Sequence, residues 1–287
     1  MELEKVGEKM SFKKYAICFL ILIVGITFIS AKFYADGQLK KKLDQCIADN
    51  PLPATYESAS VTWFGFKPFV KGVKFSLPNL KQPVTINKVY FPDYDTEHEI
   101  PHYMTVDIRG LVAPRNNFFK NLGYKDDNLN VNAYINYKYD SKKMRFDLNT
   151  LRWTAENVAQ IESNFHFSNI KLNNSLIFSY PNIQIEQATM KIVDDTLMDQ
   201  VMTHNAKIKG KTKEQFVKNT LNRLEYMKSQ AKSKWMKDSF DELAKFYKNP
   251  QSLTIQINPD KPVTIRELNS EPNNIKKAKL LNLQIKS

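Results

Sequence analysis

The residues best suited to chemistry form the segment His98-Glu99-Ile100-Pro101-His102, which matches the letters of the zinc-protease motif H-E-x-x-H. In that motif both histidines lie on one face of a helix, and the glutamate stands beside a metal-bound water. Pro101 argues against a helix, because an internal proline costs about 3 kcal/mol or more and favours extended backbone before it. Positions four apart in an extended chain are ~13 Å apart, too far for one ion bound at ~2 Å. We therefore expect a surface loop between strands, without a metal.

Acidic residues just before this segment have the alternating spacing of a calcium-binding loop. Asp93, Asp95 and Glu97 could supply its first ligands, but the sixth position is His98 rather than glycine, and the twelfth is not glutamate. The loop needs that glycine for a sharp turn and that glutamate as a bidentate ligand. We therefore expect no calcium site.

Other candidate catalytic residues have no recognisable partners in the sequence. His166 and His204 are isolated, and the adjacent Asp194 and Asp195 precede a helical run, where helix capping is the expected role. The sequence contains no G-x-S-x-G elbow, P-loop or dinucleotide-binding fingerprint. We expect no catalytic, cofactor-binding or metal-binding residues, no cofactor and no enzymatic activity.

The composition is that of a folded, basic chain. Apolar residues make up 42% of the 287 residues, and the formal net charge is +12. Such a charge favours anionic partners, namely lipid head groups, nucleic acid or acidic proteins, although an AT-rich genome would supply the same lysines as plain solvated surface. Trp63, Trp153 and Trp235 are interleaved with lysines, as in nucleic-acid stacking sites. We interpret them as core residues and expect no nucleic-acid partner.

An uncharged apolar segment over residues 15–31 predicts a transmembrane helix. Because the stem of Lys32 can snorkel, the apolar stretch extends to Ala35, and about 20 helical residues span a bilayer core of ~30 Å. A buried core helix is seldom apolar on all faces over such a length. A cleaved signal peptide is the stronger alternative, but the stretch is long for one and Ser30-Ala31 is a mediocre cleavage site. The expectation is a cytoplasmic N-terminus (1–14), an uncleaved anchor (15–35) and a periplasmic domain, in the inner (cytoplasmic) membrane.

The chain after the anchor reads as a short connecting helix (36–50) followed by a β-rich domain (51–195). Alternation of apolar and polar residues is clearest from Leu129 to Tyr137, where every second residue would point to one face of a sheet. Turn residues such as Pro181-Asn182 separate these runs. The spacing predicts antiparallel strands with one apolar face and one wetter face.

The period changes to that of helices in residues 196–250. Thr212 precedes Gln215 by three positions, which is the spacing of a capping box. A second helical run ends at Asn249-Pro250. Between Lys207 and Lys248, basic residues outnumber acids by twelve to five, so the outer surface of these amphipathic helices would be cationic. Residues 251–287 return to strands.

Three features together carry a resemblance to known proteins. They are the run from Val61-Thr62-Trp63 to Lys71-Gly72-Val73-Lys74-Phe75, the passage from Ala188 to Asp195, and the segment from Asn249 to Ile255. In these features the chain resembles the AsmA-like and YdgA-like single-pass envelope proteins of Gram-negative bacteria. The resemblance implies an inner-membrane anchor and a curved periplasmic sheet, and larger AsmA-like proteins are associated with lipid handling and envelope integrity.

The sequence thus predicts an α+β fold: an N-terminal transmembrane helix, then a mainly antiparallel, curved β-sheet domain with two amphipathic helices near the C-terminus. The expected function is a membrane-anchored lipid-binding or envelope-maintenance module without catalytic activity. The alternative is a structural adaptor for an envelope protein complex. The expected partners are the lipid bilayer and either a phospholipid or an envelope protein. A sheet face left open would favour lipid, and one filled by its own side chains would favour the adaptor.

Overall fold

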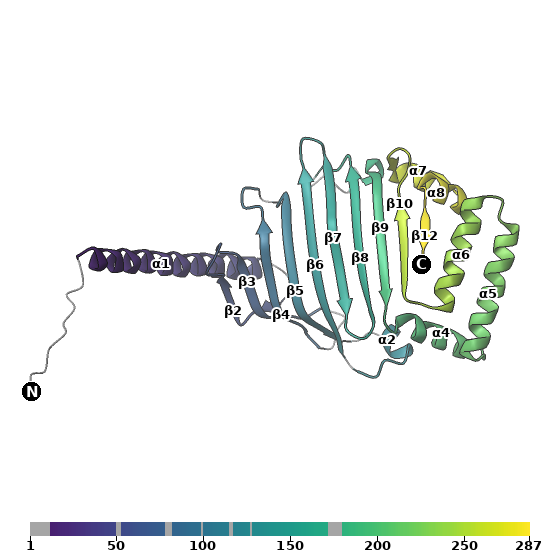
Figure 1. Cartoon of the computed structure of the whole chain (residues 1–287), viewed down its shortest axis with the longest axis horizontal. Coiled ribbons are helices and arrows are strands. Elements are labelled where there is room, and N and C mark those ends of the chain that lie inside the picture. Colours follow the sequence, from purple (N-terminus) through teal and green to yellow (C-terminus); the bar gives the residue numbers. More distant parts are fainter. Residues whose placement is uncertain are drawn as a thin grey trace, which may run out of the picture.

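A computed structural model of the chain describes residues 12–49, 53–77, 82–98, 100–114, 117–126, 128–171 and 180–287. Helix α1 (Phe12–Ala48) extends from one end of a twelve-stranded antiparallel sheet, and a group of helices lies at the other end (Figure 1). From β3 to β10 the strands lie side by side in chain order. The mostly antiparallel sheet agrees with the alternation seen in the sequence.

The strands are β1 (Ala54–Thr55), β2 (Ser58–Val61), β3 (Pro68–Phe75), β4 (Val84–Tyr94), β5 (Tyr103–Pro114), β6 (Asn128–Asp140), β7 (Arg145–Ala155), β8 (Ala159–Ser168), β9 (Gln184–Asp194), β10 (Ser252–Ile257), β11 (Val263–Thr264) and β12 (Gln284–Lys286). Register shifts interrupt several of the ladders, for example between Ile108 and Leu111 in β5. Gly110 lies in this irregularity with a φ of +60°, a backbone conformation that glycine adopts without steric cost.

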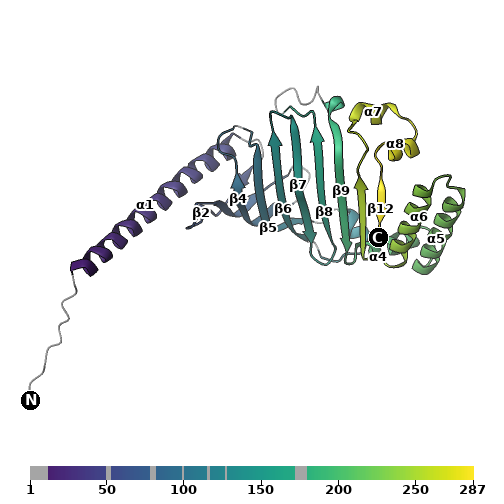
Figure 2. The same cartoon turned by 45° about the horizontal axis from the view of Figure 1, so that its top comes forward.

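The helices after α1 are α2 (Asn117–Asn121), the 3-10 turn η1 (Tyr180–Asn182), α4 (Leu197–Ile208), α5 (Lys213–Gln230), α6 (Lys234–Lys248), α7 (Ile265–Ser270) and α8 (Asn274–Leu280). Helices α4 to α6 connect β9 to β10, which are hydrogen-bonded neighbours, so this helical group is an excursion from the sheet (Figures 1 and 2). Thr212 and Gln215 form the expected capping box at the start of α5. Within 251–287, α7 and α8 lie between strands, where the sequence pattern predicts strands alone.

The structure contradicts the expected transmembrane helix. Among the residues described, none of the helices combines the length and the apolar character needed to cross a membrane. The predicted span over residues 15–35 and the single-pass inner-membrane location with a periplasmic domain are therefore wrong on this finding. Helix α1 also continues unbroken to Ala48, so no separate connecting helix begins at residue 36. Most of the predicted cytoplasmic N-terminus, residues 1–11, lies outside the described residues.

The second half of α1 packs against the first strands, which gives the correction a physical basis. The ring of Phe28 lies 6.3 Å from that of Trp63 and 5.4 Å from that of Phe66, between centroids. The ammonium group of Lys32 lies 4.9 Å from the centroid of the Trp63 ring and forms an ion pair with Asp36 at 2.6 Å. Two residues of the predicted span thus contact the protein itself.

Candidate functional site

One face of the sheet is apolar along its whole width. Cross-strand pairing aligns a row of eight residues from β3 to β10, all of them apolar: Val70, Val89, Ile108, Ala133, Trp153, Ile161, Ile192 and Leu253. A second row, from β6 to β12, contains Ile135, Leu151, Ser163, Met190, Ile255 and Ile285. These rows define what we call the apolar face.

The opposite face is polar, because successive side chains on a strand point to opposite sides. The row that alternates with the two apolar rows contains Asp107, Tyr134, Arg152, Glu162, Lys191, Thr254 and Lys286. Arg152 and Glu162 form an ion pair across β7 and β8 at 3.0 Å. The two-faced sheet is the one that the alternation from Leu129 to Tyr137 predicts.

The described helices leave the apolar face uncovered over the central strands. Among the described residues, the main helix–strand contacts are those of α1 with β2, α6 with β12 and α7 with β11, and none of these strands is one of β5 to β8. No helix that the structure describes lies over β5 to β8 in either view (Figures 1 and 2). A sheet normally buries its apolar face against a second layer. The missing layer makes this face a candidate binding surface.

Exposure of the larger side chains supports this interpretation. Trp153, near the middle of the face, is 40% exposed, and Leu151 and Ile161 are partly exposed. Small residues paired with them on the neighbouring strands are buried, namely Ala133 opposite Trp153 and Ser163 opposite Leu151. The interpretation of Trp63 and Trp153 as core residues is therefore wrong, since Trp63 is also 49% exposed.

The segment with the two histidines differs from its expected geometry. The loop between β4 and β5 bends, so that the rings of His98 and His102 stack with centroids 3.6 Å apart and an interplanar angle of 18°. The premise that an extended backbone separates them by ~13 Å is wrong. Asp95 lies beside them, and its Oδ2 accepts a hydrogen bond from the backbone amide of His102 at 2.8 Å. Glu99 lies outside the described residues.

Asp95 is the centre of this loop. Its side chain is 4% exposed, its Oδ1 accepts from the amide of Glu97 at 2.8 Å, and its Oδ2 lies 2.7 Å from His98 Nδ1. Hydrogen bonds from the backbone amides of His102 and Glu97 lower the pKa of Asp95 to about 2. The carboxylate is therefore ionised at neutral pH. We call Asp95, His98 and His102 the histidine cluster.

The remaining candidate residues lie apart from this cluster. Asp93 points away to Lys67 at 3.8 Å, so the acidic residues of the supposed calcium loop do not converge. Asp194 Oδ1 accepts from the amide of Met198 at 2.9 Å, which is the expected capping role at α4, and burial raises its pKa. His166 is not isolated, because its Nδ1 lies 2.6 Å from Asp147 Oδ1. His204 lies on α4.

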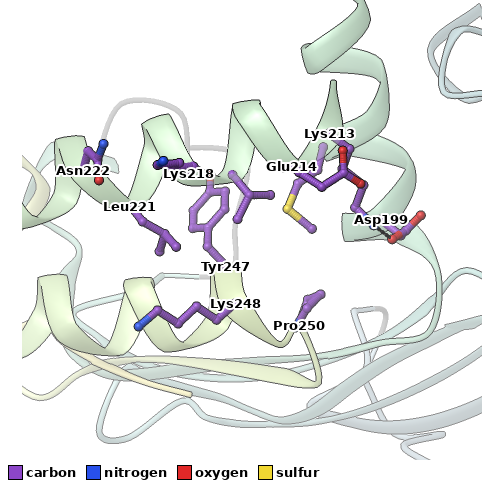
Figure 3. Close-up of a pocket in the computed structure, with 11 residues that line it drawn as sticks. Asp199, Lys213, Glu214, Lys218, Leu221, Asn222, Tyr247, Lys248 and Pro250 are labelled. Carbon is purple, nitrogen blue, oxygen red and sulfur yellow. Dashed lines mark hydrogen bonds and ion pairs between the residues drawn. The ribbon is translucent and has the colours of Figure 1, made fainter. Parts of the chain in front are cut away.

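An open cleft of about 470 Å³ lies among α4, α5, α6 and the turn after α6 (Figure 3). Its apolar lining consists of Met202, Val217, Leu221, Tyr247 and Pro250. Three lysines, two acids and Asn222 line the rest, and Lys213 is paired with Asp199. Because the charges partly neutralise one another, the cleft does not define an anion site. We place the candidate site on the apolar face instead.

Comparison with known proteins adds little about function. A family model described as an uncharacterized protein matches residues 152–287, which run from β7 to the last residue. The match includes the later strands and the helical group, and it leaves out α1, β1 to β6 and the histidine cluster. No curated protein matches the chain. The resemblance to AsmA-like and YdgA-like proteins stays a prediction.

Proposed function

We propose that this protein is a non-catalytic lipid-binding module that holds an acyl chain on the apolar face of its sheet. The observation that supports the proposal is the row from Val70 to Leu253, which is apolar on eight adjacent strands and lacks a covering layer in the described structure. At a strand spacing of ~4.8 Å, eight strands extend over roughly 34 Å. Such a surface can take an extended hydrocarbon chain.

Energetics favour a flexible apolar ligand. Each methylene removed from water contributes ~0.8 kcal/mol, so even partial burial of a long acyl chain gives useful affinity. The apolar face offers both flat aromatic and branched aliphatic side chains, such as Trp153 and Ile161. The net charge of +12 would attract an anionic head group, although no single cation is assigned to that role.

The adaptor alternative predicts a different sheet. In an adaptor, the protein's own side chains would fill the apolar face, and a partner would bind at a sheet edge or surface patch. Partial exposure of Leu151, Trp153 and Ile161 favours the lipid proposal. A phospholipid is the natural physiological form of the ligand, and a fatty acid is the simplest probe of it.

The proposal is tested by titrating the full chain with oleate below its micelle concentration, using calorimetry and tryptophan fluorescence. Trp63→Phe and Trp235→Phe changes leave Trp153 as the reporter on the apolar face. Leu151→Asn should weaken binding at least tenfold, because it places an amide in the second apolar row. Arg152→Asn is the matched control, since it is the next residue on the opposite face, and it should change affinity less than twofold.

Two results would overturn the proposal. One is the absence of oleate binding by the unaltered chain together with an unchanged Trp153 emission spectrum. The other is an equal loss of affinity in Leu151→Asn and Arg152→Asn, which would place the ligand elsewhere. Circular dichroism of both variants separates these results from a failure to fold.

A further inference from the structure

The histidine cluster has the donor atoms and the spacing of a metal site. Each of Asp95, His98 and His102 offers one ligand atom, and the three atoms lie within 4.8 Å of one another. Two imidazole nitrogens and one carboxylate oxygen form a ligand set that zinc accepts in proteins. We propose that these three residues bind one divalent transition-metal ion, of which Zn²⁺ fits best, at the β4–β5 loop.

The protein backbone already holds two of the three ligands in place. Asp95 extends the β4–β5 ladder, since its backbone amide donates to the carbonyl of Tyr103 at 2.9 Å. Its carboxylate accepts hydrogen bonds from the backbone amides of Glu97 and His102. The His102 carbonyl accepts from the amide of Tyr139, on β6, and the two rings meet edge to face at 5.2 Å. A site built on strand ends is more rigid than one on a free loop.

Binding one ion requires a small movement of the ligand atoms, chiefly at His98, the third ligand. Ligands at ~2.0 Å from a tetrahedral ion are about 3.3 Å apart. Asp95 Oδ2 and His98 Nδ1 are 2.7 Å apart, so they must separate slightly, and the widest pair in the cluster must approach. The stacked rings must also tilt, because parallel rings do not aim their nitrogens at one point. The side chain of His98 is 48% exposed, so its ring can turn toward solvent as it leaves the stack with His102.

The ligand set also narrows the choice of ion. Magnesium and calcium prefer sites made wholly of oxygen ligands, whereas imidazole suits zinc and its neighbours in the transition series. Three protein ligands leave the fourth tetrahedral position to water. The ion would tie the end of β4 to the start of β5 without any helix of the zinc-protease kind. We assign no reaction to it.

The test uses the full chain without an affinity tag, stripped with chelator and dialysed. Calorimetric titration with Zn²⁺ should show one equivalent bound, and Co²⁺ substitution should give the visible absorption of a tetrahedral site. His98→Ala should reduce the affinity at least tenfold and abolish the Co²⁺ band. His166→Ala is the matched control, because His166 also pairs with a carboxylate but has no second histidine beside it; it should bind as the unaltered chain does.

The outcome at His98 decides the question, because its side chain is half-exposed and its replacement removes one ring stack, on His102, and one contact with Asp95. Failure of the unaltered chain to bind Zn²⁺ at millimolar concentration would overturn the proposal. So would a His98→Ala variant that binds Zn²⁺ as tightly as the unaltered chain, or a His166→Ala variant that loses binding instead. Far-UV circular dichroism and the unfolding midpoint of each variant show whether its fold is intact.

Discussion

The carboxylate of Asp36, on helix α1, accepts a hydrogen bond from the backbone amide of Val61, on strand β2, with an N–O distance of 2.6 Å. The same carboxylate accepts from the hydroxyl of Ser60 at 2.9 Å and pairs with Lys32 at 2.6 Å. One acidic side chain therefore fastens the long helix to the sheet. The ring contacts of Phe28 with Trp63 and Phe66 and a hydrogen bond from the Tyr56 hydroxyl to Asp44 add to this attachment.

Replacing Asp36 by alanine should lower the free energy of unfolding by about 1–3 kcal/mol, because the Val61 amide and the Ser60 hydroxyl lose a part-buried acceptor. Urea unfolding followed by circular dichroism measures the change. Lys41→Ala, an exposed substitution on the same helix, should stay within about 0.5 kcal/mol of the unaltered chain. Equal stabilities for the two variants would mean that α1 is not held by Asp36.

Acid should weaken the loop around Asp95 in a defined pH window. Its pKa is about 2 in the folded chain and ~3.9 when unfolded, so the folded state favours the ionised carboxylate. That stabilisation is fully present above about pH 4 and is lost as the pH falls toward 2. Acid unfolding curves should therefore show a smaller loss of stability between pH 4 and 2 in Asp95→Asn than in the unaltered chain. Identical slopes would contradict the assignment.

The backbone at Gly110 should be intolerant of any side chain. A Cβ there would lie 2.3 Å from the Asn87 amide nitrogen, and the positive φ would itself cost about 1–2 kcal/mol. Gly110→Ala should thus destabilise the protein by more than Gly210→Ala, where φ is +62° but the space is open. Adding Asn87→Ala should recover the steric part of the loss. Equal effects at the two glycines, measured by thermal or urea unfolding, would exclude the clash.

The sequence predicts the two-faced sheet because the side-chain period of two is visible in each strand alone. It does not predict which residues align across strands, since register depends on irregularities such as the one at Gly110. The row from Val70 to Leu253 therefore appears only in three dimensions. The sequence likewise does not predict that the apolar face lacks a covering layer in the described structure. Helical periodicity in 196–250 predicts helices there, but it does not indicate where those helices pack.

The sequence does not predict the histidine cluster, for a local reason. Pro101 favours extended backbone before it, whereas the Asp95 side chain accepts a hydrogen bond from the amide two residues later and turns the chain. Aspartate favours this kind of turn, so the position of Asp95 just after a strand was a usable indication. The prediction for residues 15–35 fails for another reason. Their apolar composition predicts lipid contact, and the sequence pattern does not reveal that Phe28 and Lys32 contact the aromatic turn at Trp63 on the same chain.

The chain-order arrangement of strands from β3 to β10 has an evolutionary consequence. Each strand from β3 to β9 is hydrogen-bonded to the strands that precede and follow it along the polypeptide, so a duplicated hairpin could be inserted between two neighbours without changing the order of the others. Because a hairpin adds two strands with the same inside-outside alternation, the insertion would widen the hydrophobic strip and leave its chemistry intact. Homologues are therefore expected to vary in breadth by pairs of strands.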